Sequence, residues 1–144
     1  GQNCGPWVRL YMSGHEGAPW AWCAGFVTFV LKQAAQALQS TSVIPGSFSC
    51  DILATQGKSA GLFVKGSSIA DGSVPYDTLP VAGIFLIRRT STDWTHTGFV
   101  TSFREDSFST IEGNTNDDGN REGYEVCTLT RGYGKKDFIM LAAR

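Results

Sequence analysis

Residues 23–39 read CAGFVTFVLKQAAQALQ, and this stretch decides how the first part of the chain folds. Its apolar side chains recur every three or four positions, and lysine, threonine and glutamine side chains fall between them. Such spacing places the apolar side chains on one face of an α-helix. The sequence therefore predicts an amphipathic helix that begins at Cys23 and ends near Gln39.

The pattern around this helix changes from helical to extended along the chain. Residues 6–12 and 50–56 have helical spacing and are flanked by glycines, so two shorter helices are expected there. After Pro80 the chain consists of short apolar runs separated by polar or glycine-rich residues, which is typical of strands. The expected strands are residues 84–89, 96–104, 109–112, 124–129 and 138–142. Residues 66–80 have no clear period and are expected to form a surface loop.

Helices followed by a run of strands predict an α+β fold with an antiparallel sheet. The 144 residues are typical of one domain, so residues 1–144 are expected to form a single unit. The 12 Lys and Arg nearly balance the 13 Asp and Glu, whereas a nucleic-acid surface needs clustered cations. Binding of nucleic acid is therefore not expected. The apolar uncharged stretch at residues 17–31 is shorter than the ~18 apolar residues that cross a bilayer, so no transmembrane segment is expected.

Cys23 is the first candidate for chemistry. We expect it to open the long helix, where unpaired backbone N–H groups and the positive end of the helix dipole stabilise a thiolate. A lowered thiol pKa makes a cysteine nucleophilic at neutral pH. A second interpretation stays open, because Cys23 also lies in phase with the apolar face and a buried cysteine packs as a small apolar residue.

His96 and two polar residues that follow it can complete a nucleophilic site. Glu112 and Asn114 lie two positions apart at the end of a predicted strand, so an extended backbone projects both to the same face. A thiol, an imidazole that takes its proton, and a carboxylate or amide that orients the imidazole form a catalytic triad. We choose Glu112 as the residue that holds His96, because the turn-like residues after Asn114 would carry it toward the sheet edge.

Four blocks of the sequence, in order, resemble those of a known enzyme family. The blocks are residues 19–27 (PWAWCAGFV), 80–86 (PVAGIFL), 96–100 (HTGFV) and 111–116 (IEGNTN). They are similar to the successive blocks of a CHAP domain, the cysteine- and histidine-dependent amidohydrolase/peptidase family, and the similarity covers nearly the whole chain. It implies the papain-like fold of the wider NlpC/P60 group, with the nucleophile on a helix packed against an antiparallel sheet. It also implies cleavage of amide bonds in bacterial peptidoglycan, at the cell wall or in the periplasm.

The resemblance also assigns roles to four residues. By position, Cys23 matches the family's nucleophile, His96 its general base, and Glu112 and Asn114 the Glu-x-Asn pair that follows. Phage members of the family often have an Asp-rich calcium loop before the nucleophile and a Gln immediately before it. This chain has the sequence HEG at residues 15–17 and Trp22 at those places, so we expect that calcium site to be absent.

A different calcium pattern lies between the expected strands at residues 109–112 and 124–129. The EF-hand ligand positions would be filled by Asn114, Asn116, Asp118 and Glu125, with Gly119 at the turn. The first position is normally Asp, and the flanking segments are predicted strands where an EF-hand has helices. A hairpin loop accounts for the same residues through their turn geometry. We therefore assign no metal ligand and expect no cofactor.

The aromatic residues and the remaining cysteines are assigned on weaker patterns. Trp20, Trp22 and Trp94 are candidates for contacts with substrate, although at least two of the four tryptophans are expected to pack in the core. The other cysteines are expected to be structural: Cys4, Cys50 and Cys127. A disulfide between two of them stays open, because sequence alone does not choose a pairing.

These observations predict a cysteine amidase or endopeptidase that cleaves peptidoglycan peptides through an acyl-enzyme. The expected partner is therefore a bacterial peptidoglycan peptide, and an inhibitor or immunity protein is a further class of partner left open. The same residues would also support acyl transfer to an amine. A third alternative is a catalytically silent papain-like module that binds the cell wall or another protein.

Overall fold

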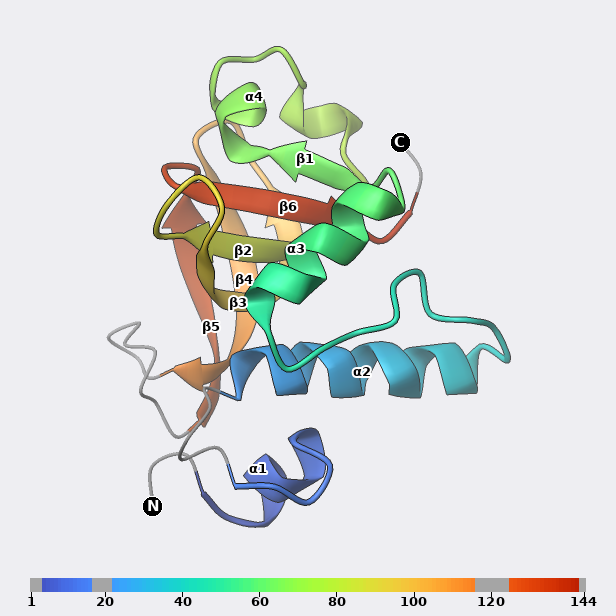
Figure 1. The fold of residues 1–144 in the computed structure, drawn as a ribbon. Coiled ribbons are helices and arrows are strands. Elements are labelled where there is room, and N and C mark those ends of the chain that lie inside the picture. Colours follow the sequence, from blue (N-terminus) through green and yellow to red (C-terminus); the bar gives the residue numbers. More distant parts are fainter. Residues whose placement is uncertain (1–3, 17–21, 116–124, 143–144) are drawn as a thin grey trace.

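The structure is a computed structural model that describes residues 4–16, 22–115 and 125–142 (Figure 1). Its helices are α1 (Pro6–Tyr11), α2 (Cys23–Ala37), α3 (Cys50–Ser59), α4 (Gly66–Ala70) and the 3-10 helix η1 (Tyr76–Thr78). Its strands are β1 (Phe63–Lys65), β2 (Gly83–Arg88), β3 (Trp94–Phe103), β4 (Ser107–Thr115), β5 (Glu125–Gly132) and β6 (Lys136–Met140). Among the described helices, none has both the length and the apolar character needed to span a membrane.

The six strands form one antiparallel sheet in the order β1-β6-β2-β3-β4-β5. The predicted α+β class with an antiparallel sheet is thus confirmed. All three expected helices and all five expected strands are present, with ends that differ by a few residues. Residues 66–80 were expected to form a loop without regular structure. That expectation is wrong, because α4 and η1 lie in this segment and β1 immediately precedes it.

Helices α2 and α3 pack on one face of the sheet. In Figure 1, α1 and α2 lie together below the sheet, and α4 lies above it beside β1. The alternation along β2 divides the core into two clusters, because Ile84 and Leu86 pack with residues of α2 and α3. Phe85, between them, packs into the second cluster with Phe108 and other aromatic side chains. This alternation is the expected consequence of successive side chains pointing to opposite faces of a strand.

A glycine in β4 lets the start of α2 approach the sheet closely. A Cβ atom on Gly113 would lie 2.7 Å from Cζ3 of Trp22 and 2.9 Å from Cβ of Phe26, closer than real side chains allow. The neighbouring residue in β4 is Glu112, and the neighbouring residue of Trp22 is Cys23. The bare backbone at Gly113 therefore brings two candidate site residues together.

Candidate active site

Cys23 is the first residue of α2 and is 1% exposed. Within the described part of the chain, no side chain caps the helix start, so the N–H groups of the first turn have no side-chain acceptor. These N–H groups and the helix dipole favour negative charge on the sulfur. The predicted location of Cys23 at a helix N-terminus is confirmed.

His96 of β3 contacts Glu112 of β4. Nε2 of His96 lies 2.7 Å from Oε1 of Glu112, and both side chains are buried. The two strands pair antiparallel, so residues separated in sequence are brought side by side. The contact between His96 and Glu112 that the sequence predicted is therefore present.

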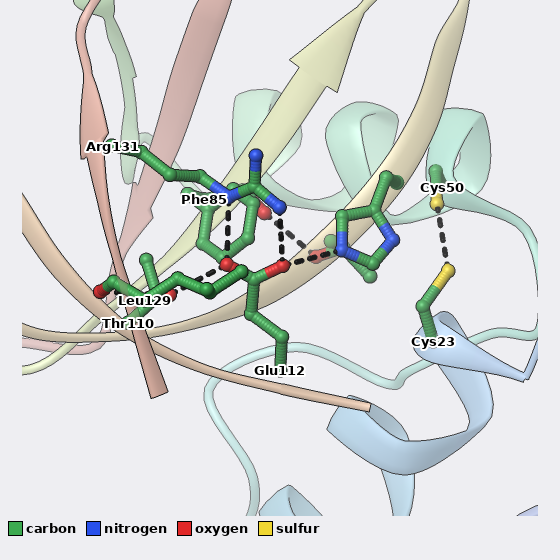
Figure 2. A network of polar contacts seen from close by, with 9 residues as sticks. Cys23, Cys50, Phe85, Thr110, Glu112, Leu129 and Arg131 are labelled. Atoms are coloured by element: carbon green, nitrogen blue, oxygen red, sulfur yellow. Dashed lines mark hydrogen bonds and ion pairs between the residues drawn. The ribbon is translucent and has the colours of Figure 1, made fainter. Parts of the chain in front are cut away.

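Glu112 accepts hydrogen bonds from three side chains (Figure 2). Arg131 of β5 forms a two-pronged pair with it, with Nε 2.7 Å from Oε2 and Nη2 2.7 Å from Oε1. The hydroxyl of Thr110 donates to Oε2 at 2.5 Å. Burial raises the pKa of Glu112, but the hydrogen bonds from Arg131, His96 and Thr110 outweigh it and lower the pKa to about 2. Glu112 is therefore ionised across the physiological range.

The ionised Glu112 fixes which nitrogen of His96 carries the proton. A carboxylate only accepts hydrogen bonds, so Nε2 must donate, and in a neutral imidazole the lone pair then lies on Nδ1. Nδ1 is buried and forms no hydrogen bond with the residues that the structure describes. Cys23 lies close enough to influence the pKa of His96. The site therefore presents a basic nitrogen beside a thiol.

The pKa values of the two groups move toward each other. A hydrogen bond from Cys50 lowers the pKa of the Cys23 thiol, burial opposes this, and the neighbouring His96 adds to the lowering, so the pKa falls well below its usual value. Burial lowers the pKa of His96, but the neighbouring Cys23 and Glu112 outweigh it, so the pKa is raised. This pattern favours a thiolate beside an imidazolium at neutral pH.

A second thiol lies beside Cys23. Cys50 is the first residue of α3, and its Sγ lies 4.0 Å from Sγ of Cys23, as Figure 2 shows. Both side chains are buried. The sequence indicated only a structural role for Cys50, whereas the structure places it in the site.

The tryptophans assigned to substrate contacts have different locations. Trp22 and Trp94 are both buried in the core, in agreement with the expectation that at least two tryptophans pack there. Trp94 donates from Nε1 to Asp137 at 3.0 Å and lies under the ammonium group of Lys58, so it anchors α3 and β6 to β3. The structure gives no support to a ligand contact at Trp94. Trp20 lies outside the described residues.

Asn114 belongs to β4, but its side chain lies outside what the structure describes. The pairing of β4 with β5 shifts register between Glu112 and Thr115, which marks an irregularity of the β-bulge type. That Glu112 and Asn114 share a face concerns the Asn114 side chain and therefore stays a prediction. Most of the EF-hand-like pattern falls in residues 116–124, which are not described, but its flanking segments β4 and β5 are strands, as expected.

Sequence reasoning missed Arg131, Thr110 and Cys50. Thr110 lies two positions before Glu112 in β4. Arg131 lies opposite Phe108, four positions before Glu112, and its long side chain reaches along the sheet to the carboxylate. Only a correct register for β4 and β5 would have indicated this pair. The position of Cys50 depends on how α3 packs against α2, which no local pattern records. Comparisons with family models, curated proteins and solved structures give no match to this chain.

Proposed function

We propose that this chain is a cysteine-dependent amidohydrolase or peptidase with a papain-like fold, and that it cleaves an amide bond in peptidoglycan peptides. The observation that carries the proposal is the line from Cys23 through His96 to Glu112, with the Glu112 end ionised and bound to Arg131. A buried imidazole with one nitrogen held by a carboxylate and the other beside a thiol of lowered pKa suits nucleophilic catalysis.

The proposed reaction uses each of these groups in turn. The Cys23 sulfur attacks the carbonyl carbon of the amide, and the imidazolium of His96 gives its proton to the leaving amine as the carbon–nitrogen bond breaks. The resulting thioester is attacked by water, which loses a proton to Nδ1 of His96. Release of the carboxylic acid restores the thiolate and the imidazolium. Glu112 keeps the imidazole oriented and stabilises its positive charge in both steps.

The substrate class rests on the resemblance to CHAP domains, carried by the blocks around Cys23, His96 and Glu112. The six-stranded antiparallel sheet with the nucleophile at a helix start is consistent with it. The acyl acceptor decides the type of reaction. With water as the acceptor the reaction is hydrolysis, and with an amine the same residues would transfer the acyl group.

The experiment is digestion of purified bacterial peptidoglycan, with the soluble fragments identified by mass spectrometry. We expect new amino and carboxyl termini at one type of amide bond, which identifies the bond. Cys23→Ala is the matched control and should release nothing, because it removes only the sulfur. Asn114→Ala, which leaves the triad intact, should change KM more than kcat.

Other outcomes would overturn the proposal in a defined way. Binding of the chain to peptidoglycan in a sedimentation assay without new termini would indicate a silent binding module. Products that carry an added amine in place of a new carboxyl group, in the presence of a competing amine, would indicate an acyltransferase. Equal release by the Cys23→Ala variant would remove the thiol from the mechanism.

A further inference from the structure

Cys50, the second thiol at the site, takes no step in the hydrolysis described above. Cys23 and Cys50 each open a helix, and their sulfurs are 4.0 Å apart in a buried environment. A disulfide requires a sulfur–sulfur distance of about 2 Å. The two sulfurs therefore have to approach by about 2 Å to form the bond.

Two contacts anchor the start of α3 near Cys23. On the side of α2, the Thr28 hydroxyl donates to the carbonyl of Ser47 at 2.8 Å and accepts from its N–H at 2.9 Å. On the side of the sheet, Oδ1 of Asp51 accepts from the backbone N–H of Trp94 at 2.6 Å. Cys50 lies between these anchors, so its position beside Cys23 is fixed from both directions.

We propose that Cys50 is a resolving cysteine, which forms a reversible disulfide with Cys23 when the site meets a peroxide. The inference rests on the proposed function in one respect, because a site that admits a peptide carbonyl also admits hydrogen peroxide. The disulfide removes the nucleophile, so the enzyme is inactive while oxidised. It also protects Cys23 from irreversible oxidation to the sulfinic acid.

The chemistry balances in two steps. The Cys23 thiolate attacks one peroxide oxygen, the oxygen–oxygen bond breaks, and the leaving hydroxide takes the proton of the His96 imidazolium to form water. The Cys50 sulfur then attacks the sulfenic sulfur of Cys23, and the hydroxide that leaves takes the Cys50 proton. Two sulfurs have lost one electron each, and the peroxide has gained two and become two waters. A dithiol reductant reverses the bond by thiol–disulfide exchange.

The test treats the reduced full chain with a small excess of hydrogen peroxide and follows its intact mass. We expect a loss of two hydrogens, and peptide mapping without reduction should show one linked pair that contains Cys23 and Cys50. Dithiothreitol should restore the original mass and the free thiols. Retention of two or three added oxygens on Cys23, or linkage of Cys23 to Cys4 or Cys127, would overturn the proposal.

Cys50→Ser is the matched control, because it keeps the size and removes the resolving sulfur. Peroxide should then add oxygens to Cys23 that dithiothreitol does not remove. If peroxide adds no more oxygen to this variant than to the unchanged chain, and dithiothreitol restores the mass of both equally, Cys50 has no resolving role.

The readout is mass and not turnover, so the two proposals fail separately. If the chain forms the Cys23–Cys50 disulfide but releases no peptidoglycan fragments, only the proposal of hydrolysis is contradicted. If the chain cleaves peptidoglycan but peroxide oxidises Cys23 beyond the disulfide, only the proposed resolving role of Cys50 is contradicted. In an active chain, peroxide should abolish fragment release, and dithiothreitol should restore most of it, while Cys50→Ser should stay inactive.

Discussion

Glu112 is the residue on which the electrostatics of the site depend. It holds Nε2 of His96, and its own charge is compensated by Arg131 and Thr110. Because its pKa is about 2, it acts as a fixed negative charge near neutral pH. The raised pKa of His96 follows in part from this charge. Removal of the charge should therefore be visible in the titration of His96.

We predict that Glu112→Gln lowers kcat roughly ten- to a thousandfold and moves the alkaline limb of the pH profile to lower pH. The working form pairs a thiolate with an imidazolium, so activity rises as Cys23 ionises and falls as His96 loses its proton. Without the carboxylate, the imidazolium is less stable and the pKa of His96 falls. The pH range of full activity therefore becomes narrower at its alkaline end.

The pKa of His96 is also measurable without substrate. The chain has only two histidines, so proton NMR resolves them, and His15→Ala assigns the signals. Circular dichroism should confirm that the Glu112→Gln variant is folded. An unchanged His96 titration in a folded Glu112→Gln variant would contradict the electrostatic role.

Individual residues of the site were predictable to different degrees. Cys23, His96 and Glu112 stood out because a helix start and two strand ends are local patterns with chemistry attached. Arg131 and Cys50 did not, since their roles arise from strand register and helix packing. A buried carboxylate implied a cationic partner, but several arginines were available in the sequence.

At the scale of elements, the approach of α2 to β4 sets the distance between Cys23 and Glu112. We predict that Gly113→Ala destabilises the fold by about 1–3 kcal/mol and lowers kcat, because its Cβ would displace Trp22 and Phe26. The shift would move the start of α2 away from His96. Urea unfolding and peptidoglycan release measure the two effects.

Gly132→Ala is the matched control for this overpacking. A Cβ on Gly132, in β5, would have its nearest neighbour at 3.9 Å, an ordinary contact. It should therefore change stability by less than about 0.5 kcal/mol and leave turnover unchanged. Similar losses of stability and turnover in both variants would show that the close contact at Gly113 does not control the site.

The elements that sequence reasoning found were the long periodic ones. α2 has four turns of clear periodicity, and the five longer strands each have flanking glycine or polar residues. β1 has three residues and α4 has five. Segments this short contain too few apolar positions to show the hydrophobic period of a strand or of a helix. β1 is a strand because it pairs with β6, from the far end of the chain, and this long-range contact overrides weak local preference.

At the scale of the whole molecule, the buried carboxylate couples stability to acid. The folded pKa of Glu112 is about 2 against an ordinary value of 4.5, so the folded state holds its proton less tightly than the unfolded state. Its contribution is fully present above pH ~4.5 and is lost as the pH falls toward 2. We predict that this group alone removes on the order of 3 kcal/mol of stability over that window.

Urea unfolding at a series of pH values between neutrality and pH ~3 measures how the free energy of unfolding changes with pH. Glu112→Gln is the comparison, since it cannot titrate, and its stability should fall less steeply in acid. Parallel pH dependence of the two proteins would show that other carboxyl groups account for acid unfolding.

The position of Arg131 on an edge strand has a consequence for the order of events during synthesis. β5 is one of the two outer strands of the sheet, and it follows Cys23, His96 and Glu112 along the chain. A ribosome therefore releases the thiol, the imidazole and the carboxylate before the guanidinium that compensates the carboxylate. Until β5 docks, Glu112 lacks its counter-ion and His96 lacks a fixed partner. The charge of Glu112 is therefore balanced by Arg131 only after β5 has joined the sheet.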